Sequence, residues 1–255
     1  MRLAYIVLAH DAPDQLARLT RRLAVEDDRV FVHVDARVPR APFDAAVGSL
    51  DGVRMLPSVA SPWGGFGLVH APLIGIRQAL AEADPPDRLV LLSGRDYPIK
   101  PRAAIVERLR EPVAFMEAFA LPAPGFTDGG GMDRLERYYL RPSRRWSLPN
   151  RFVPFWPRRR LPAGLRPFAG KQFWCLPRDV AAAVCRDLDE RPEIEAFFRH
   201  SFVADESFFQ MLVLNGPHAA RVVSDDLRFI RHATGEAHPR LLTAADFDEI
   251  AASSD

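Results

Sequence analysis

The sequence predicts an α/β fold with a mostly parallel central sheet flanked by helices. Apolar runs of strand length lie at residues 3–9 and 89–92, and a third at 30–34 is interrupted only by His33. Such runs are typical of strands that are buried on both faces, as they are in parallel sheets. Helical patterns and short connections separate these runs, and strands that alternate with helices favour a doubly wound arrangement.

The elements can be assigned in order along the chain. After the first strand, Asp11 and Pro13 begin a helical pattern that places Leu16, Leu19 and Leu23 on one face. The further expected elements are strands at 30–34, 53–56, 89–92 and 173–176, helices at 68–83 and 178–188, and a helix that begins near residues 205–206. We assign all 255 residues to one domain.

Polar residues follow three of the expected strands. His10 and Asp11 come after the first strand, Asp35 after the second, and residues 93–96 after the strand at 89–92. In doubly wound sheets, ligands bind at the carboxyl ends of the strands. The sequence therefore predicts a binding site at this edge of the sheet.

Residues 133–171 differ in composition from the rest of the chain, because they are rich in Arg, Pro and Trp. The prolines rule out a long helix, so we expect an extended excursion over the surface. The Arg residues between 134 and 166 can bind phosphates or RNA, or they can form a solvated loop with salt bridges. The composition leaves both alternatives open.

The overall charge and the missing motifs narrow the classes of function. Lys and Arg total 34 against 33 Asp and Glu, so the net charge of +1 argues against a nucleic-acid partner. The chain lacks the glycine-rich dinucleotide and P-loop motifs and the usual zinc-ligand spacings. The N-terminal apolar run is too short for a signal peptide or a membrane span. The sequence does not require Cys175 and Cys185 to form a disulfide, so we expect a cytoplasmic protein. Peripheral contact with a membrane stays open.

The tract VADESFFQ at residues 203–210 has two interpretations. In the first, Asp205 caps a helix and Glu206 complements the helix dipole in its first turn. In the second, the helix start holds the Glu206 carboxylate toward a cleft, where it takes a proton from an attacking sugar hydroxyl. One residue can serve both roles.

Several motifs, taken together and in this order, resemble one family. They are AYIVLAH at 4–10, HVD at 33–35, WGGFGLV at 63–69, LLSGRDYPIK at 91–100, GKQFW at 170–174, DESFFQ at 205–210, LRFI at 227–230 and HPR at 238–240. Together they resemble the core-2/I-branching β-1,6-N-acetylglucosaminyltransferases and the peptide O-xylosyltransferases. The resemblance covers nearly the whole chain.

The resemblance implies a GT-A (Rossmann-like) fold and an inverting, metal-independent glycosyltransferase. A sugar, GlcNAc or xylose, would move from a UDP-sugar to a hydroxyl of a glycan or other acceptor, with residues 1–110 binding the nucleotide and residues 111–255, including the excursion 134–168, binding the acceptor. The resemblance assigns these roles to residues: Glu206 as the catalytic base; Arg240 as the catalytic cation at the UDP diphosphate; Asp35, Trp63 and Asp96 in the nucleotide site; Glu117, Arg134 and His232 at the acceptor. We expect no metal, because basic side chains neutralise the leaving diphosphate.

The sequence departs from the family pattern in two places. His232 stands where the branching enzymes place an acceptor-stacking Trp. The Lys-containing segment that shares the diphosphate with Arg240 would follow Asp255, where the sequence ends. A truncated C-terminus, a substituting Arg or impaired activity would each account for this. A non-catalytic UDP-sugar or glycan-binding relative is the alternative function.

Overall fold

A seven-stranded sheet with the strand order β11-β5-β10-β4-β1-β2-β3 forms the centre of the protein. The computed structural model describes residues 1–140, 151–152, 157–231 and 239–253. The sheet strands are β1 (Leu3–Ala9), β2 (Arg29–Val34), β3 (Val53–Met55), β4 (Arg88–Ser93), β5 (Ala114–Met116), β10 (Trp174–Pro177) and β11 (Val222–Val223). The predicted α/β fold class is confirmed.

The sheet is mostly parallel, as the apolar runs predict. β1 pairs in parallel with β2 and β4, β2 with β3, and β5 with β11. β10 runs antiparallel to both of its neighbours, β4 and β5. Its amino end therefore lies at the edge where the other strands have their carboxyl ends.

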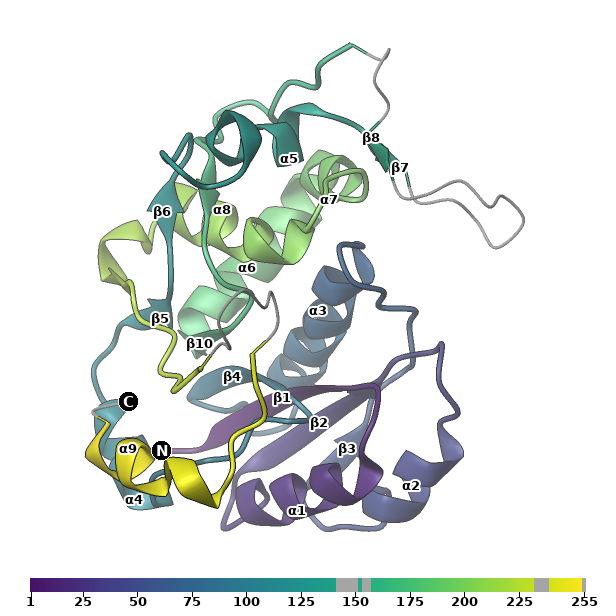
Figure 1. Ribbon diagram of the computed structural model, residues 1–255, viewed down its shortest axis with the longest axis vertical. Helices are drawn as coiled ribbons and strands as arrows, with labels where there is room; N and C mark the ends of the chain where they lie inside the picture. Colours follow the sequence, from purple (N-terminus) through teal and green to yellow (C-terminus); the bar gives the residue numbers. More distant parts are fainter. Residues whose placement is uncertain (141–150, 153–156, 232–238, 254–255) are drawn as a thin grey trace.

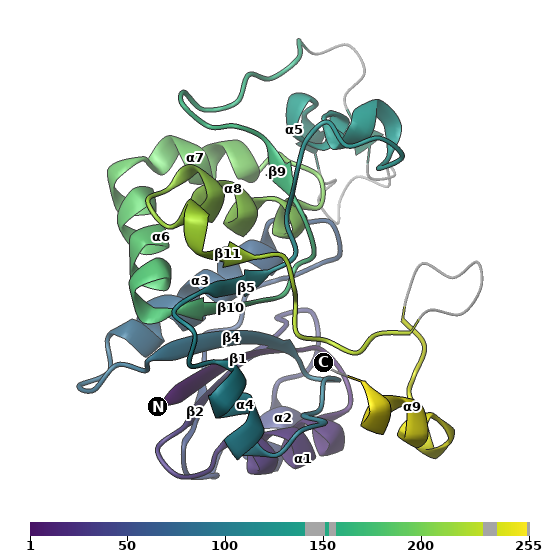
Figure 2. The ribbon, with the colours of Figure 1, turned by 90° about the vertical axis from the view of Figure 1, so that its left-hand side faces the viewer.

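Helices cover both faces of the sheet (Figure 2). One face carries α1 (Pro13–Leu23), α2 (Ala41–Val47) and α4 (Arg102–Arg108), and the other carries α3 (Gly67–Leu80), α6 (Arg178–Glu190) and α8 (Phe208–Asn215). Strand β1 shows why both faces are needed. Leu3, Tyr5 and Val7 pack with the first group, while Ala4 and Ile6 pack with the second, so the apolar run is buried except at Leu8, which is half-buried.

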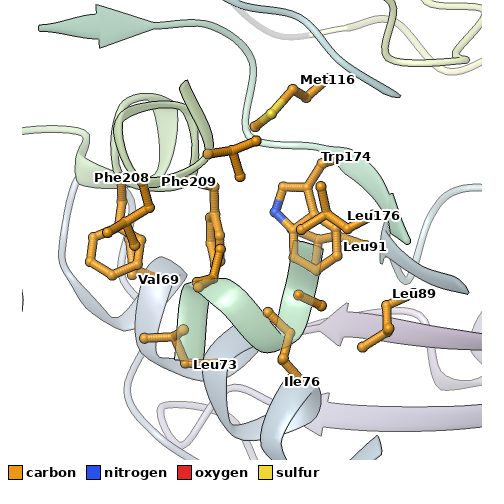
Figure 3. Close-up of a cluster of buried hydrophobic side chains, with 14 of the residues drawn as sticks. Val69, Leu73, Ile76, Leu89, Leu91, Met116, Trp174, Leu176, Phe208 and Phe209 are labelled. Atoms are coloured by element: carbon orange, nitrogen blue, oxygen red, sulfur yellow. The ribbon is translucent and has the colours of Figure 1, made fainter. Parts of the chain in front are cut away.

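The larger core lies between the sheet and helices α3, α6 and α8 (Figure 3). Trp174 of β10 is fully buried, and its ring centroid lies 5.1 Å from that of Phe209 on α8. Helix α3 approaches the sheet closely because Gly75 faces β1. A Cβ atom added there would lie 2.7 Å from Ile6 Cγ2. This packing fixes α8, and with it the turn that carries Glu206.

The structure corrects the expected helix start at residues 205–206. A 3-10 turn, η2 (Ala204–Glu206), precedes α8, which begins only at Phe208. Ser207 separates them with an extended φ of −139°, and no side chain caps α8. The interpretation of Asp205 as a helix cap is therefore wrong. Its carboxyl is buried beneath the turn instead.

The described part of the Arg-rich segment forms short elements. They are α5 (Asp133–Glu136), the pair β7 (Tyr139–Leu140) with β8 (Arg151–Phe152), and β9 (Phe168–Ala169), which pairs with β6 (Phe119–Ala120). Trp146, Trp156 and His232 lie outside the described residues.

Two further helices lie in the second half of the chain (Figure 1). Helix α7 (Pro192–Phe198) follows α6, and α9 (Phe247–Ala252) lies near the C-terminus. Cys175 and Cys185 are buried free thiols. In the part of the chain that the structure describes, no helix is long and apolar enough to cross a membrane.

Candidate active site

Acidic side chains gather at the carboxyl edge of the sheet. They follow the strands in this order across the sheet: Asp226 after β11, Glu117 after β5, Asp96 after β4, Asp11 after β1 and Asp35 after β2. Because β10 is reversed, Lys171, which precedes it, reaches the same edge. The predicted location of the site thus holds a row of carboxylates from both halves of the sequence.

Glu206 and Arg134 form an ion pair above this edge. The Arg134 guanidinium donates to Glu206 Oε2 at 2.5 Å, and about a third of the Glu206 side chain is exposed. The guanidinium also lies 4.5 Å from the ring centroid of Phe126, which limits its movement. The pair therefore presents an oriented carboxylate to solvent. The two residues come from the predicted base and acceptor sets, and the structure brings them together.

The turn that carries Glu206 is held from two sides. The Val203 amide donates to the Gly64 carbonyl at 3.2 Å, and the Gly170 amide donates to the Glu206 carbonyl at 2.8 Å. Val203 adopts a left-handed φ of 50°, which turns the chain into η2. Asp205 beside it is buried, and this burial, followed by the charge of Glu206, raises the pKa of Asp205 to about 7.

Glu117 lies beside Lys171 and Asp226. Lys171 Nζ is 2.8 Å from Glu117 Oε2 and 3.2 Å from Asp226 Oδ2. Gly170 allows the segment of Lys171 to pack closely on the segment of Glu117, because a Cβ atom added at Gly170 would stand 1.8 Å from the Glu117 carbonyl oxygen. Through Gly170, the segments of Glu117 and Glu206 are neighbours. Of the predicted acceptor residues, Arg134 thus contacts the predicted base directly, and Glu117 lies on a segment that is joined to it through Gly170.

Asp96 lies next to a buried arginine. Its Oδ2 accepts from the Ser93 amide at 2.8 Å and lies 3.7 Å from Arg228 Nη2. The Arg228 guanidinium also donates to the Leu91 carbonyl and lies 4.0 Å from the ring centroid of Phe173. Burial lowers the pKa of Arg228, although Asp96 and Asp226 oppose the shift. A buried cation is therefore held at the carboxyl end of β4.

Asp35 is tied into a loop that leads toward Glu206. Arg37 binds its carboxylate through both prongs, and the Ser61 amide donates to Asp35 Oδ1 at 3.3 Å. Burial raises the pKa of Asp35, but these hydrogen bonds outweigh it and lower the pKa overall. Two residues beyond Ser61, Trp63 is largely exposed, and its ring centroid lies 5.4 Å from that of Phe202. Trp63 thus lies against the segment that enters the Glu206 turn.

Arg240 lies in the C-terminal segment, which runs beyond the carboxyl ends of β1 and β4 (Figure 2). Its guanidinium is bound by both oxygens of Asp246, and its amide donates to the Arg231 carbonyl at 2.8 Å. This pairing lowers the pKa of Asp246. The described contacts of Arg240 therefore lie within its own segment, and none joins it to the other predicted site residues.

The Arg-rich segment makes structural contacts where it is described. Arg159 is buried, and it donates to the His200 carbonyl at 2.8 Å and to the Phe197 carbonyl. Burial lowers its pKa to about 10. Arg158 pairs with Glu136 at 2.6 Å. Arg159 thus supports the α7 region and is not available to meet a phosphate.

Sequence reasoning missed Lys171, Asp226, Arg228 and Arg37 as members of the site. Lys171 and Arg228 lie in the motifs GKQFW and LRFI, and Asp226 and Arg37 closely follow strands. Their positions near strand ends were the available signal. Among the described residues, no group of three or more His, Cys, Asp or Glu side chains could hold a metal ion.

The protein has an α/β fold, and the site at the carboxyl edge of its sheet contains an oriented carboxylate and fixed cations. The model of the Core-2/I-Branching enzyme family matches residues 3–251. The chain belongs to this family of glycosyltransferases.

Xylosyltransferases are among the similar curated proteins. Human xylosyltransferase 1 is 27% identical over 238 residues, which cover 89% of this chain and 24% of that protein. Rat xylosyltransferase 2 is 26% identical over 237 residues, covering 89% and 26%. The chain spans about a quarter of the length of these relatives. A solved 4-diphosphocytidyl-2C-methyl-D-erythritolsynthase from Anaerococcus prevotii DSM 20548 aligns with a TM-score of 0.35 at 10% identity, over 73% of this chain and 75% of that chain.

Proposed function

We propose that this chain transfers a sugar from a UDP-sugar to a hydroxyl group of a glycan or other acceptor. GlcNAc and xylose are the proposed donor sugars. The observation that carries the proposal is the Glu206 carboxylate, oriented by Arg134 at 2.5 Å and partly open to solvent. A hydroxyl attacking an anomeric carbon must lose its proton, and a positioned carboxylate can accept it.

The proposed reaction is a single displacement with inversion. Glu206 takes the proton of the acceptor hydroxyl, the hydroxyl oxygen bonds to the anomeric carbon, and the bond to UDP breaks with its electrons on the diphosphate. Glu117 and Arg134 orient the acceptor, while Asp35, Asp96 and Trp63 contact the nucleotide. The Asp35 side chain is only 4% exposed and is already bound by Arg37, so the proposed contact is with the main chain beside Asp35.

We propose that side-chain cations, and no metal, meet the charge on the leaving diphosphate. Arg240 is the proposed contact, and Arg228, fixed beside Asp96, adds a second positive charge at the same edge. Fixed cations in a partly dry site stabilise developing negative charge without reorganising. In the ground state Asp246 holds Arg240, so Arg240 would exchange one carboxylate partner for the diphosphate.

A panel of UDP-sugars tests the donor. Ligands that bind only the native state raise its melting temperature, so UDP-GlcNAc or UDP-xylose should stabilise the protein more than CDP-sugars do. The stabilising donor should then be hydrolysed slowly in the absence of acceptor. Binding without any turnover would instead identify a non-catalytic relative. No stabilisation by any UDP-sugar would contradict the proposal.

A further inference from the structure

We propose that Lys171 is a positioning residue of the acceptor site, which holds the Glu117 carboxylate in the orientation that receives the acceptor. This inference rests on the proposed function, because it takes Glu117 as an acceptor contact. It assigns a role to Lys171, which had none in the proposed function. It also predicts a variant that affects acceptor binding and not donor binding.

The geometry places one ammonium group between two carboxylates from different strands. Glu117 follows β5 and Asp226 follows β11, and Lys171 precedes β10, the other neighbour of β5. The Nζ atom lies 2.8 Å from Glu117 Oε2 and 3.2 Å from Asp226 Oδ2. An ammonium group has three donors, so it can serve both carboxylates and keep one donor for a further oxygen.

The three side chains differ in exposure, so the cluster has a buried end and a solvent-exposed end. The Asp226 side chain is 7% exposed, whereas Glu117 is 36% and Lys171 46% exposed. Asp226 is the buried anchor of the cluster, whereas Glu117 and Lys171 are both partly open to solvent. Partial burial alone would lower the pKa of Lys171, but its pairing with Glu117 and Asp226 raises it. Lys171 is therefore charged throughout the neutral range.

The main chain around Lys171 is held as firmly as its side chain. The Lys171 carbonyl accepts from Gln210 Nε2 of α8 at 2.6 Å, and the Gly170 amide donates to the Glu206 carbonyl at 2.8 Å. Lys171 is thus attached to the segment of the proposed base as well as to Glu117. An exposed ion pair between freely moving side chains contributes little, but here the backbone of the cation is fixed.

Removal of the charge should release Glu117 without unfolding the protein. Without Lys171, Glu117 loses its described ion-pair partner and can rotate away from the acceptor. Asp226 keeps a nearby cation, because Arg228 interacts electrostatically with it and donates from Nη1 to its main-chain carbonyl at 2.9 Å. We therefore expect a defect in acceptor binding and little change on the donor side.

The test compares Lys171→Met, Lys171→Arg and the control Lys100→Met, since Lys100 and Lys171 are the two lysines of the sequence. Lys100 donates to the Ser253 carbonyl at 2.7 Å, in the C-terminal segment. Two rates are measured: hydrolysis of the UDP-sugar in water, which reports the donor site, and transfer to the best acceptor of a panel of methyl glycosides.

Lys171→Met should raise the acceptor KM by about five- to tenfold, the loss expected when one hydrogen bond to the acceptor is weakened. Hydrolysis of the donor, the donor KM and the melting temperature should stay close to those of the wild type. Lys171→Arg should recover most of the acceptor affinity, and Lys100→Met should resemble the wild type. With lysine labelled by ¹³C and ¹⁵N, the Nζ signal of Lys171, and not that of Lys100, should shift when the methyl glycoside is added.

Two results would overturn the inference while leaving the proposed function intact. One is an unchanged acceptor KM in Lys171→Met, and the other is an equal loss of hydrolysis and transfer, which would assign Lys171 to the donor site or the fold. Absence of transfer from the wild-type protein to every methyl glycoside would contradict the proposed acceptor class, and this inference with it.

Discussion

Gly170 packs directly on the main chain of Glu117, so closely that a Cβ atom at residue 170 would stand 1.8 Å from the Glu117 carbonyl oxygen. The same glycine donates its amide to the Glu206 carbonyl at 2.8 Å. A residue without a side chain therefore sets the spacing between the two segments that carry the proposed acceptor carboxylate and the proposed base.

Gly170→Ala should separate these two segments. The added methyl group meets main-chain atoms, which cannot rotate aside, so we expect a loss of about 1–3 kcal/mol in the free energy of unfolding. Transfer activity should fall further than stability alone explains. Gly216→Ala is the milder comparison, because its Cβ would lie 3.0 Å from the Leu212 carbonyl oxygen, so its effect should be smaller. Urea denaturation and transfer rates check both, and a Gly170→Ala protein with wild-type values would contradict the packing argument.

Glu206→Gln should abolish most of the turnover and leave the fold intact. The amide keeps the size of the side chain and can still accept from Arg134, but it cannot take a proton. We expect the transfer rate to fall by roughly 10²–10⁴-fold, the range for a lost general base. UDP affinity by calorimetry should stay unchanged. The control is Glu195→Gln, at an α7 carboxylate that pairs with Arg199. Normal specific activity in an unstable Glu206→Gln protein would assign Glu206 a structural role.

Because the Asp205 carboxyl is buried, the free energy of unfolding should decrease as the pH rises. Its pKa is raised from 3.8 to about 7, by burial first and by the charge of Glu206 second, with Arg134 opposing. Between these values the native state binds more protons than the unfolded state, so the free energy of unfolding decreases from about pH 4 to about pH 7. Asp205→Asn should remove this slope and gain at most about 4 kcal/mol at pH 8.

Urea midpoints measured from pH 4 to pH 8 check this expectation. Asp248→Asn on the exposed face of α9 is the matched control and should leave the slope in place. If wild type and Asp205→Asn differ equally at pH 5 and pH 8, the Asp205 carboxyl does not titrate in this range.

Arg240→Ala and Asp246→Asn should act on UDP binding in opposite directions. Asp246 occupies the Arg240 guanidinium, so Asp246→Asn leaves Arg240 with a weaker partner and should strengthen UDP binding, or at least preserve it. Arg240→Ala removes a charge-assisted contact and should weaken binding by about tenfold or more. Arg240→Lys should recover part of it, because a point charge replaces a two-pronged donor.

Calorimetry with UDP distinguishes this from a purely structural pair. If the Arg240–Asp246 pair were purely structural, either substitution would loosen the C-terminal segment in the same way, and both would change UDP affinity in the same direction. Equal UDP affinities for the wild type and both variants would place the diphosphate contact elsewhere, and Arg228 would be the next candidate.

Activity should persist when divalent metals are removed. We propose that fixed cations meet the diphosphate, so transfer measured after EDTA treatment should be within about twofold of the untreated rate, and added Mn²⁺ should change it little. A strict Mn²⁺ requirement would contradict this and would direct attention to Asp96 and Asp35.

The sequence was sufficient for the strands β1, β2, β3, β4 and β10, and insufficient for β5 and β11. The apolar runs of β1, β2 and β4 are enough by themselves to predict strands that are buried on both faces. The two and three residues of β11 and β5 are too short for any period, and their strand state depends on their neighbours in the sheet. The direction of β10 is likewise a property of the assembled sheet.

For the site, the motifs supplied candidates such as Glu206 and Arg134, whereas the contacts between side chains are visible only in the structure. Glu206 and Arg134 were predicted separately, and the structure joins them. Lys171 lies in the motif GKQFW, but this motif does not indicate its partners, because Glu117 and Asp226 follow strands that are distant in the sequence. Asp205 was mistaken for a helix cap because an acidic residue before an apolar helix looks the same whether it caps the helix or is buried beneath it.

The place of β10 in the sheet has a consequence for how the protein folds. In the strand order, β5 and β11 are hydrogen-bonded to the rest of the sheet only through β10, although β4 and β5 are sequence neighbours. The strands β1 to β4 can pair as soon as the first 93 residues exist, but β5 has no place beside them until residues 174–177 insert between. Such long-range insertion closes a large loop and is slow. The two sides of the site should therefore come into register in a late folding step.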